Sequence, residues 1–225
     1  MNGVAIRDAA TIVLLRDGPD GPATLMGQRG AKAAFMPSKV VFPGGAVDPG
    51  DAAVRLAAPL EARTRRALAH DAIIAPEALA AAALRELGEE TGQAIGQAID
   101  QADGQPGAGC AWPAYRGLVP DPAPLRFVFR AITPPGRPRR FDARFFLTPA
   151  AALAGDPDRF DDADAELSHL RWVPLARARD LDLPFVTEVV LAEVQALVET
   201  GGPGEAGIPF FDNSGADSLF RRIPG

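Results

Sequence analysis

Three glutamates, Glu86, Glu89 and Glu90, stand close together in the sequence. Residues 77–87 are rich in alanine and leucine, which favour a helix, and Gly92 follows as a natural stop. On a helix the three glutamates share one face, where their negative charges repel each other. A hard divalent cation bound by carboxylate oxygens would reverse that repulsion. The spacing therefore indicates a metal site, although glutamates on a helix more often form a solvated face.

The segment Val40–Gly45 favours the metal interpretation. It is a short apolar run, expected to be a strand, that ends in a Pro-Gly-Gly turn. Because glycine has no side chain, the backbone at Gly44 and Gly45 can approach a ligand or a metal closely. The two segments together predict a site built from a glycine turn and an acidic helix.

Gly44-Gly45 followed by Arg85-Glu86-x-x-Glu-Glu-x-Gly resembles the signature of the Nudix hydrolases, which cleave nucleoside diphosphates linked to another moiety. This sequence departs from the family pattern at three places. Asp51 stands where the family has glutamate, Gln93 stands where the family has an aliphatic residue, and residues 52–84 replace a much shorter spacer.

The resemblance implies an α/β fold, the Nudix α/β/α sandwich with a mixed β-sheet, and a helical insertion at 52–76 within the signature. It also implies that the metal ligands are Glu86, Glu89, Glu90 and the backbone carbonyl of Gly44. Glu89 or Glu90 could instead orient the attacking water, and Glu86, Glu89 and Glu90 are all catalytic candidates. Arg85 precedes Glu89 by four residues, and it is expected to hold that carboxylate in position without binding the metal itself. Oxygen ligands without a Cys/His cluster favour Mg²⁺ or Mn²⁺ over zinc.

Further motifs are similar to a Nudix branch with long insertions, which includes peroxisomal coenzyme A diphosphatases. They are Leu25-Met26-x-x-Arg29, Phe35-Met36-Pro37, and Arg139-Arg140-Phe141-Asp142-x-x-Phe145-Phe146. This branch implies coenzyme A or an acyl-CoA as the substrate. Alternatives are a pyrophosphatase for NADH, ADP-ribose or dinucleoside polyphosphates, and a nucleotide-sensing Nudix module without catalysis. Sensors of that kind usually add a basic DNA-binding region, which residues 176–225 do not resemble.

Four residues are candidates for binding the substrate: Arg29, Gly45, Arg139 and Arg140. The arginines could bind phosphates by charge-assisted hydrogen bonds, although scattered surface cations are as common. Glu166 lies in an acidic segment that would ordinarily be a solvated loop. Its position shortly before Trp172-Val173 is similar to that of a Nudix loop acid that contacts a metal or helps to activate water. Glu166 is therefore the fourth catalytic candidate.

Composition limits the remaining classes of function. A chain of 225 residues with 47% hydrophobic residues predicts one elaborated domain over 1–225. The net charge of −6 argues against general nucleic-acid binding. The only cysteine, Cys110, excludes an internal disulfide, and no signal or membrane-spanning pattern is visible, so a cytoplasmic protein is expected. The expected partner is a small nucleoside diphosphate derivative, with no nucleic acid and no membrane.

The other elements follow from local patterns. Residues 9–28 predict a hairpin, 141–147 a strand and 188–197 an amphipathic helix. Residues 100–124 are expected to be irregular, with at most one strand near 115–119. In the basic insertion at 52–76, Asp51 is the expected N-cap of two short helical stretches; a substrate lid and a homodimer contact are its functional alternatives, and a solvated excursion is the default. The apolar tail at 201–225 is expected to dock on the domain or on a second subunit.

Overall fold

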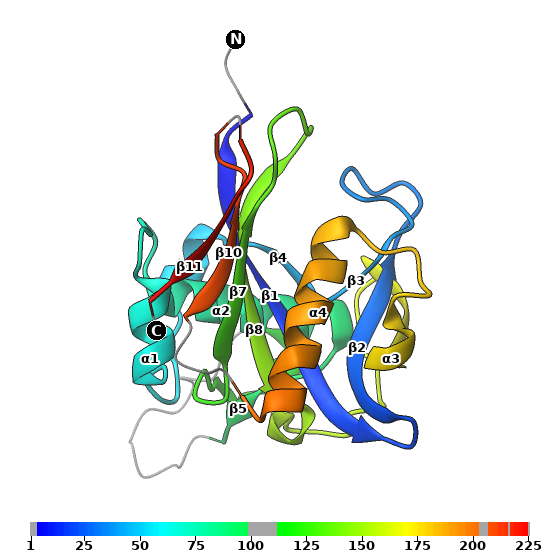
Figure 1. Ribbon diagram of the computed structural model, residues 1–225. Coiled ribbons are helices and arrows are strands. Elements are labelled where there is room, and N and C mark those ends of the chain that lie inside the picture. The colour runs from blue at the N-terminus through cyan, green and yellow to red at the C-terminus, as the bar shows by residue number, and fades with distance from the viewer. Residues whose placement is uncertain (1–3, 99–111, 203–206, 216, 225) are drawn as a thin grey trace.

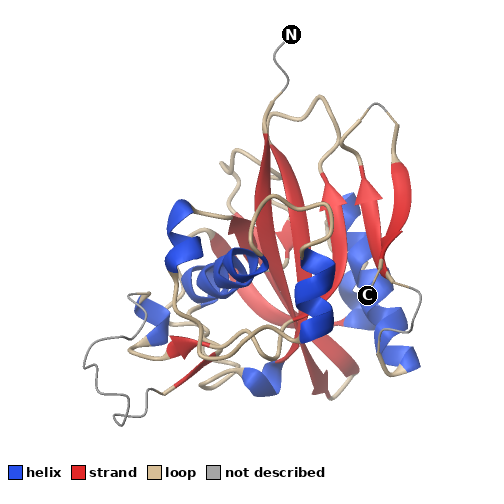
Figure 2. Ribbon diagram, turned by 90° about the vertical axis from the view of Figure 1, so that its left-hand side faces the viewer, coloured by secondary structure: helices blue, strands red, loops and turns tan. Residues whose placement is uncertain are grey.

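The structure is a computed structural model that describes residues 4–98, 112–202, 207–215 and 217–224. Its centre is a mixed nine-stranded sheet with helices on both faces (Figures 1 and 2). This arrangement confirms the predicted α/β fold on a mixed sheet with a helical insertion.

The strands of the main sheet are β1 (Ile6–Gly18), β2 (Gly21–Arg29), β3 (Val40–Val41), β4 (Gly44–Ala46), β7 (Arg126–Ile132), β8 (Arg140–Pro149), β9 (Leu167–Pro174), β10 (Ile208–Asp212) and β11 (Leu219–Ile223). The α-helices are α1 (Ala62–Leu68), α2 (Pro76–Thr91), α3 (Leu175–Ala178) and α4 (Phe185–Thr200). Three short 3₁₀ helices, η1 (Pro49–Ala53), η3 (Pro113–Tyr115) and η4 (Ala150–Ala152), and a small sheet of β5 (Gly96–Gln97) and β6 (Val119–Pro120) complete the described chain.

Strand β1 is the central strand of the sheet, whose order is β11-β10-β7-β8-β1-β2-β3. It runs parallel to β8 along most of its length and forms the predicted hairpin with β2. Near its beginning it also pairs with the short strand β4, while β2 pairs separately with β9. Because β4 and β2 pair with different parts of β1, the glycine pair of β4 sits where the sheet divides.

Two apolar layers hold the helices to the sheet. Alternate residues of a strand point to opposite faces, so Ile12 and Leu14 pack on the side of α1 and α2 while Val13 packs on the side of α4. On α4, Val190 and Val194 are fully buried, as the amphipathic pattern predicted. The sheet thereby fixes α2 on the face that carries the candidate metal site.

Several local predictions were incomplete or wrong. Strand β7 was not predicted, although it is buried in the middle of the sheet. The glycine pair belongs to strand β4 and is not only a turn. Asp51 does not cap a helix: Asp48 is the N-cap of η1, and Asp51 is the third residue of that helix. The insertion contains one α-helix, α1, capped by Glu61, which accepts hydrogen bonds from the backbone N–H groups of Arg63 and Thr64.

Strand pairing accounts for the described parts of two predicted segments, the irregular one at 100–124 and the tail at 201–225. Near 115–119 the structure has η3 and the short strand β6, while residues 99–111, with Cys110, lie outside the described residues. The tail forms β10 and β11, and β10 adds to the sheet in parallel with β7. Within the described ranges, none of the helices combines the length and apolar character needed to cross a membrane.

Candidate metal and substrate site

Helix α2 carries the three glutamates because its other side is made for close packing. Its alanines and Leu79, Leu84 and Leu87 are buried in the apolar layer under β1. Small alanine side chains let the helix lie near the sheet. Gly92 ends the helix in the left-handed conformation, with φ of 71°, and a Cβ there would lie 2.9 Å from the backbone of Asp162. The acidic side of α2 is thus turned towards β4.

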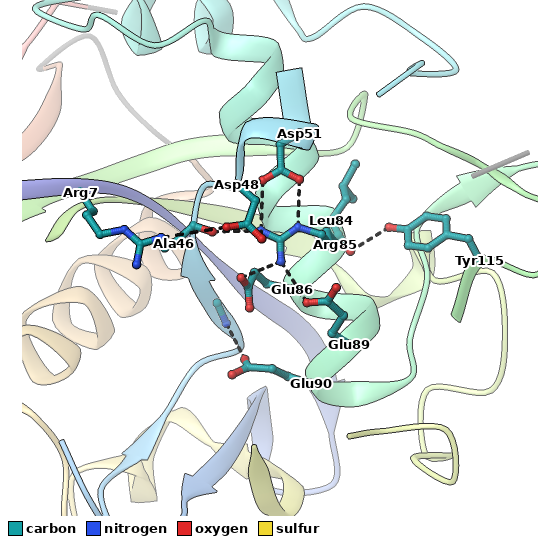
Figure 3. Close-up of polar contacts among 11 residues, drawn as sticks. Arg7, Ala46, Asp48, Asp51, Leu84, Arg85, Glu86, Glu89, Glu90 and Tyr115 are labelled. Atoms are coloured by element: carbon teal, nitrogen blue, oxygen red, sulfur yellow. Dashed lines mark hydrogen bonds and ion pairs between the residues drawn. The ribbon is translucent and has the colours of Figure 1, made fainter. Parts of the chain in front are cut away.

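Arg85 is the centre of the polar network on α2 (Figure 3). Its side chain is only 9% exposed, and its Nε and Nη2 atoms donate to the two carboxylate oxygens of Asp51 at 2.9 and 3.0 Å. Nη2 also donates to the carbonyl of Ala46, at the end of β4. Nη1 donates to Glu86 Oε1 and to Glu89 Oε2, both at 2.9 Å. One guanidinium therefore connects η1, β4 and two of the three glutamates.

Asp51 performs this pairing although it is shorter than the glutamate of the family pattern. Its side chain is 2% exposed, and it also accepts a hydrogen bond from the backbone N–H of Asp48. Burial alone would lower the pKa of Arg85, but the hydrogen bonds and charge of Asp51 and the charge of Glu86 outweigh burial and raise the pKa. Arg85 is therefore a permanent cation in this network.

Glu90 is buried with one oxygen unpaired. The residue is 1% exposed, and its Oε2 accepts a hydrogen bond of 2.7 Å from the backbone N–H of Gly44. Its Oε1 is buried and has no hydrogen-bond partner. Burial raises the pKa of Glu90 well above its usual value, and the charges of Glu86 and Glu166 add to that effect, while the Gly44 N–H opposes it. A cation bound at this free oxygen would offset the cost of burying the carboxylate charge.

Glu86, like Glu90, is a largely buried carboxylate close to other acidic side chains. Burial, with the charges of Glu89 and Glu166 added to it, outweighs the opposing charge and hydrogen bond of Arg85 and raises the pKa of Glu86 to about 7. Its carboxylate lies directly over Gly45, where a Cβ would come within 2.4 Å of Oε1. Only glycine at position 45 leaves this carboxylate in place, which gives the second glycine of the pair a steric role.

We expect Gly45→Ala to lower turnover by at least tenfold, because the new methyl group must displace the Glu86 carboxylate. Steady-state kinetics with the best substrate measure this loss, and Gly50→Ala, where a Cβ meets nothing within 4 Å, is the matched control. Unchanged turnover in Gly45→Ala would show that the position of Glu86 does not matter for catalysis.

The donor set fits a divalent cation, although the side chains are not yet gathered around one point. Among the described residues, no three Asp, Glu, His or Cys side chains are placed to hold a metal together. Arg85 takes one oxygen of Glu86 and one of Glu89. The second oxygen of each carboxylate and the unpaired Oε1 of Glu90 are the oxygen ligands that Mg²⁺ and Mn²⁺ prefer.

Glu166 and Arg29 join the site from the sheet. Arg29, at the end of β2, donates from Nη2 to Glu166 Oε1 at 2.8 Å and from Nε to the carbonyl of Phe35 at 3.1 Å. The charge of Glu166 contributes to raising the pKa of both Glu86 and Glu90, and that of Arg29 helps to lower the pKa of Glu90. The structure thus brings these two predicted residues close to Glu86 and Glu90 of α2.

The structure places Arg140 elsewhere. Its Nε donates to the carbonyl of Thr133 and its Nη2 to the carbonyl of Asn213, at 2.9 and 2.8 Å. Along β1, Arg140 is level with Ile6 whereas Gly44 is level with Thr11, a separation of about 17 Å. Arg140 fastens the tail to the β7–β8 hairpin, and Arg139 is exposed next to it.

Gln93 has a structural role that sequence reasoning did not find. Its Nε2 donates to the carbonyls of Asp156 and Arg159, and it holds the acidic loop that leads to Glu166 against the end of α2. The only signal in the sequence was the departure from an aliphatic residue at this position. An amide replaces the aliphatic side chain because this loop presents carbonyl groups to it.

We expect Gln93→Leu to lower the free energy of unfolding by about 1–3 kcal/mol, because two carbonyl groups lose their donor. Urea unfolding measures this change, and Gln195→Leu on the exposed side of α4 should stay within about 0.5 kcal/mol of the parent protein. Equal effects of the two substitutions would contradict the role of Gln93.

Comparisons with known proteins agree with the fold and the signature. No protein-family profile matches the sequence, and no curated protein matches it. Among solved structures, a Nudix hydrolase from Alicyclobacillus acidocaldarius is 33% identical, with a TM-score of 0.60 over 84% of this chain and 90% of that chain. An Ap4A hydrolase from C. elegans, 16% identical, shares the fold with a TM-score of 0.50 over 87% of this chain and 99% of that chain. The identity and coverage of the first match show that this chain belongs to the Nudix hydrolases and is a pyrophosphohydrolase.

Proposed function

We propose that the protein hydrolyses a pyrophosphate bond of coenzyme A or an acyl-CoA with the help of Mg²⁺ or Mn²⁺. The family accounts for pyrophosphate hydrolysis in general. The substrate and the metal rest on the residues of this chain. The observation that supports the metal most directly is the buried Glu90 carboxylate, whose Oε1 lacks a partner next to the Gly44 backbone.

In this proposal Glu86, Glu89 and Glu90 hold the cation together with the carbonyl of Gly44. When bound, a divalent cation neutralises phosphoryl oxygens and lowers the pKa of water. Arg85 orients the carboxylates of Glu86 and Glu89 through its hydrogen bonds to them, and its own position is set by Asp51. Glu89 is the most exposed of the three glutamates, with 41% of its side chain accessible, so it is best placed to accept a proton from the attacking water.

Arg29 and Glu166 form the opposite side of the site. The guanidinium of Arg29 can leave Glu166 for a substrate phosphate, because a phosphate offers the same charge-assisted hydrogen bonds as a carboxylate. Glu166, with 52% of its side chain exposed, is then free to orient water or to approach the cation. Gly45 contributes by leaving room for the Glu86 carboxylate that lies over it. Arg139 is the remaining exposed candidate for a phosphate, whereas Arg140 would have to give up its backbone contacts.

Two other functions are kept as alternatives. NADH, ADP-ribose and dinucleoside polyphosphates carry the same pyrophosphate group, and the glutamate site would treat that group in the same way. A nucleotide sensor would bind without cleavage. The raised pKa values of Glu86 and Glu90 favour an enzyme over a sensor, because acidic residues with shifted pKa values are concentrated at catalytic sites.

The test is a product-mass screen of coenzyme A, acetyl-CoA, NADH, ADP-ribose and diadenosine polyphosphates with Mg²⁺ or Mn²⁺. Release of 3′,5′-ADP and 4′-phosphopantetheine from coenzyme A is the expected result. Cleavage of only another substrate would overturn the coenzyme A assignment, and tight binding without cleavage would favour the sensor.

We expect millimolar Mg²⁺ or Mn²⁺ to raise the melting temperature by several degrees, because a cation relieves the repulsion among buried carboxylates and binds only the folded chain. Scanning calorimetry with and without EDTA measures the shift. The same scan of Glu90→Gln should show a much smaller shift. A metal effect of equal size in both proteins would place the cation elsewhere.

A further inference from the structure

The acidic loop at 156–166 is attached to the end of the candidate metal helix, α2. The backbone N–H of Asp164 donates to the carbonyl of Glu89 at 2.8 Å. The last carbonyl groups of a helix have no partner within the helix, so a loop N–H at this place satisfies a group that would otherwise depend on water. The loop is therefore fixed to the same residue whose carboxylate is a candidate metal ligand.

Other contacts keep this loop close to α2. Gln93, just after the helix, donates to two carbonyl groups of the loop, and the indole N–H of Trp172 donates to a third, that of Pro157, at 3.0 Å. Gly92 lies so near the loop that a Cβ at position 92 would be 3.0 Å from the Cβ of Asp162. These contacts give the loop one position relative to the glutamates of α2.

The side chain of Asp164 makes a second, separate connection. Its Oδ1 accepts a hydrogen bond of 2.8 Å from the backbone N–H of Glu166. Aspartate commonly binds the N–H two residues further on in this way, which fixes the turn between them. Because the backbone N–H of Asp164 is bound to Glu89 and its side chain to Glu166, one residue sets the spacing between these two acids.

The side-chain contact of Glu166 is one that the proposed mechanism breaks. Its carboxylate pairs with Nη2 of Arg29 at 2.8 Å, and Arg29 is expected to leave it for a phosphate. Glu166 is then held through its backbone: Leu167, the buried first residue of β9, fixes one side by pairing with β2, and Asp164 fixes the other. A misplacement of about 1 Å can cost a reacting group most of its effect, so the hold by Asp164 matters for the rate.

We propose that Asp164 is a positioning residue for hydrolysis, which holds Glu166 at a fixed distance from Glu89 after Arg29 has moved to the substrate. The inference rests on the proposed role of Glu166 and deepens it. Asp164 touches neither the substrate nor the cation, because it acts through the backbone of Glu166. Its contribution therefore belongs to the rate of the chemical step and not to substrate affinity.

The test compares kcat and KM of the full-length protein with Mg²⁺, using the substrate that the product-mass screen identifies. Asp164→Ala keeps the backbone bond to Glu89 but loses the bond to Glu166. It should lower kcat by about 3- to 10-fold, the range for one hydrogen bond, and leave KM within about twofold. Asp164→Asn, whose amide oxygen still accepts the Glu166 N–H, should keep kcat within about twofold of the parent protein.

A double substitution tests whether Asp164 acts through Glu166. In the Glu166→Gln protein, Asp164→Ala should cause no further loss of kcat, because the carboxylate that it positions is already gone. Losses that multiply in the double variant would show that the two residues act independently, and they would overturn the inference.

Asp156→Ala is the matched control. Asp156 Oδ1 accepts the N–H of Asp158 at 3.0 Å, the same kind of bond at the beginning of the same loop. Its loss should leave kcat within about twofold. Hydrogen exchange of the Glu166 amide, followed by NMR without metal, should be about 3- to 10-fold faster in Asp164→Ala and unchanged in Asp164→Asn and Asp156→Ala.

The remaining outcomes separate the inference from the proposed function. A loss of kcat in Asp156→Ala or in Asp164→Asn as large as that in Asp164→Ala would overturn the inference. Wild-type kcat in Asp164→Ala, together with a slow Glu166→Gln protein, would overturn the inference alone. Wild-type kcat in Glu166→Gln would remove Glu166 from the proposed mechanism and the inference with it. Failure to cleave any screened substrate would overturn the proposed function, whereas the amide exchange would still decide whether Asp164 holds Glu166.

Discussion

Glu90→Gln is expected to lose about three orders of magnitude in kcat while the protein stays folded. Glutamine keeps the shape of the side chain and can still accept the Gly44 N–H hydrogen bond, but it removes the negative charge that a cation needs. Metal-assisted stabilisation of the transition state is worth several kcal/mol, and about 4 kcal/mol corresponds to a thousandfold change in rate. Steady-state kinetics with saturating Mg²⁺ measure the loss.

The folded state of this variant should not be weakened. The buried carboxylate of Glu90 carries a desolvation cost, which the neutral amide avoids, so the melting temperature without metal should be equal or higher. Glu188→Gln, an exposed substitution on α4, is the matched control and should keep full activity. Wild-type turnover by Glu90→Gln would remove Glu90 from the metal site.

Arg85→Met is expected to lower the free energy of unfolding by about 3–5 kcal/mol, because it leaves the buried carboxylate of Asp51 and the crowded Glu86 and Glu89 without their shared cation. The same change should lower turnover, since the two glutamates lose the group that sets their directions. Urea unfolding and steady-state kinetics measure the two effects.

Arg85→Lys should rescue little of this loss. An ammonium group cannot bind both oxygens of Asp51 and the Ala46 carbonyl in the planar arrangement that a guanidinium provides. Arg65→Met is the matched control, because Arg65 forms an exposed ion pair with Glu77 and its loss should cost less than about 1 kcal/mol. A cost for Arg85→Met as small as that of Arg65→Met would show that the network does not support the fold.

The sequence by itself determined the elements whose causes are local. Helix propensity and a terminal glycine predicted α2, and the period of the helix placed Glu86, Glu89 and Glu90 on one side. Dense turn residues predicted the β1–β2 hairpin, and the Nudix signature predicted the family. Strand β7 was missed because it is buried on both faces, so it shows neither alternation nor a helical period.

The tertiary structure alone decided how these elements meet. The sequence contains Asp51, Arg29 and Glu166, but only folding brings Asp51 to Arg85, across the whole insertion, and Glu166 to Arg29, from the opposite half of the chain. It also separates residues that seemed equivalent: Arg29 lies at the glutamates, whereas Arg140 binds backbone carbonyls of the tail. Local sequence cannot specify these outcomes, because strand register and the route of each loop decide which charged groups share a buried space, and that sharing sets their pKa values and their partners.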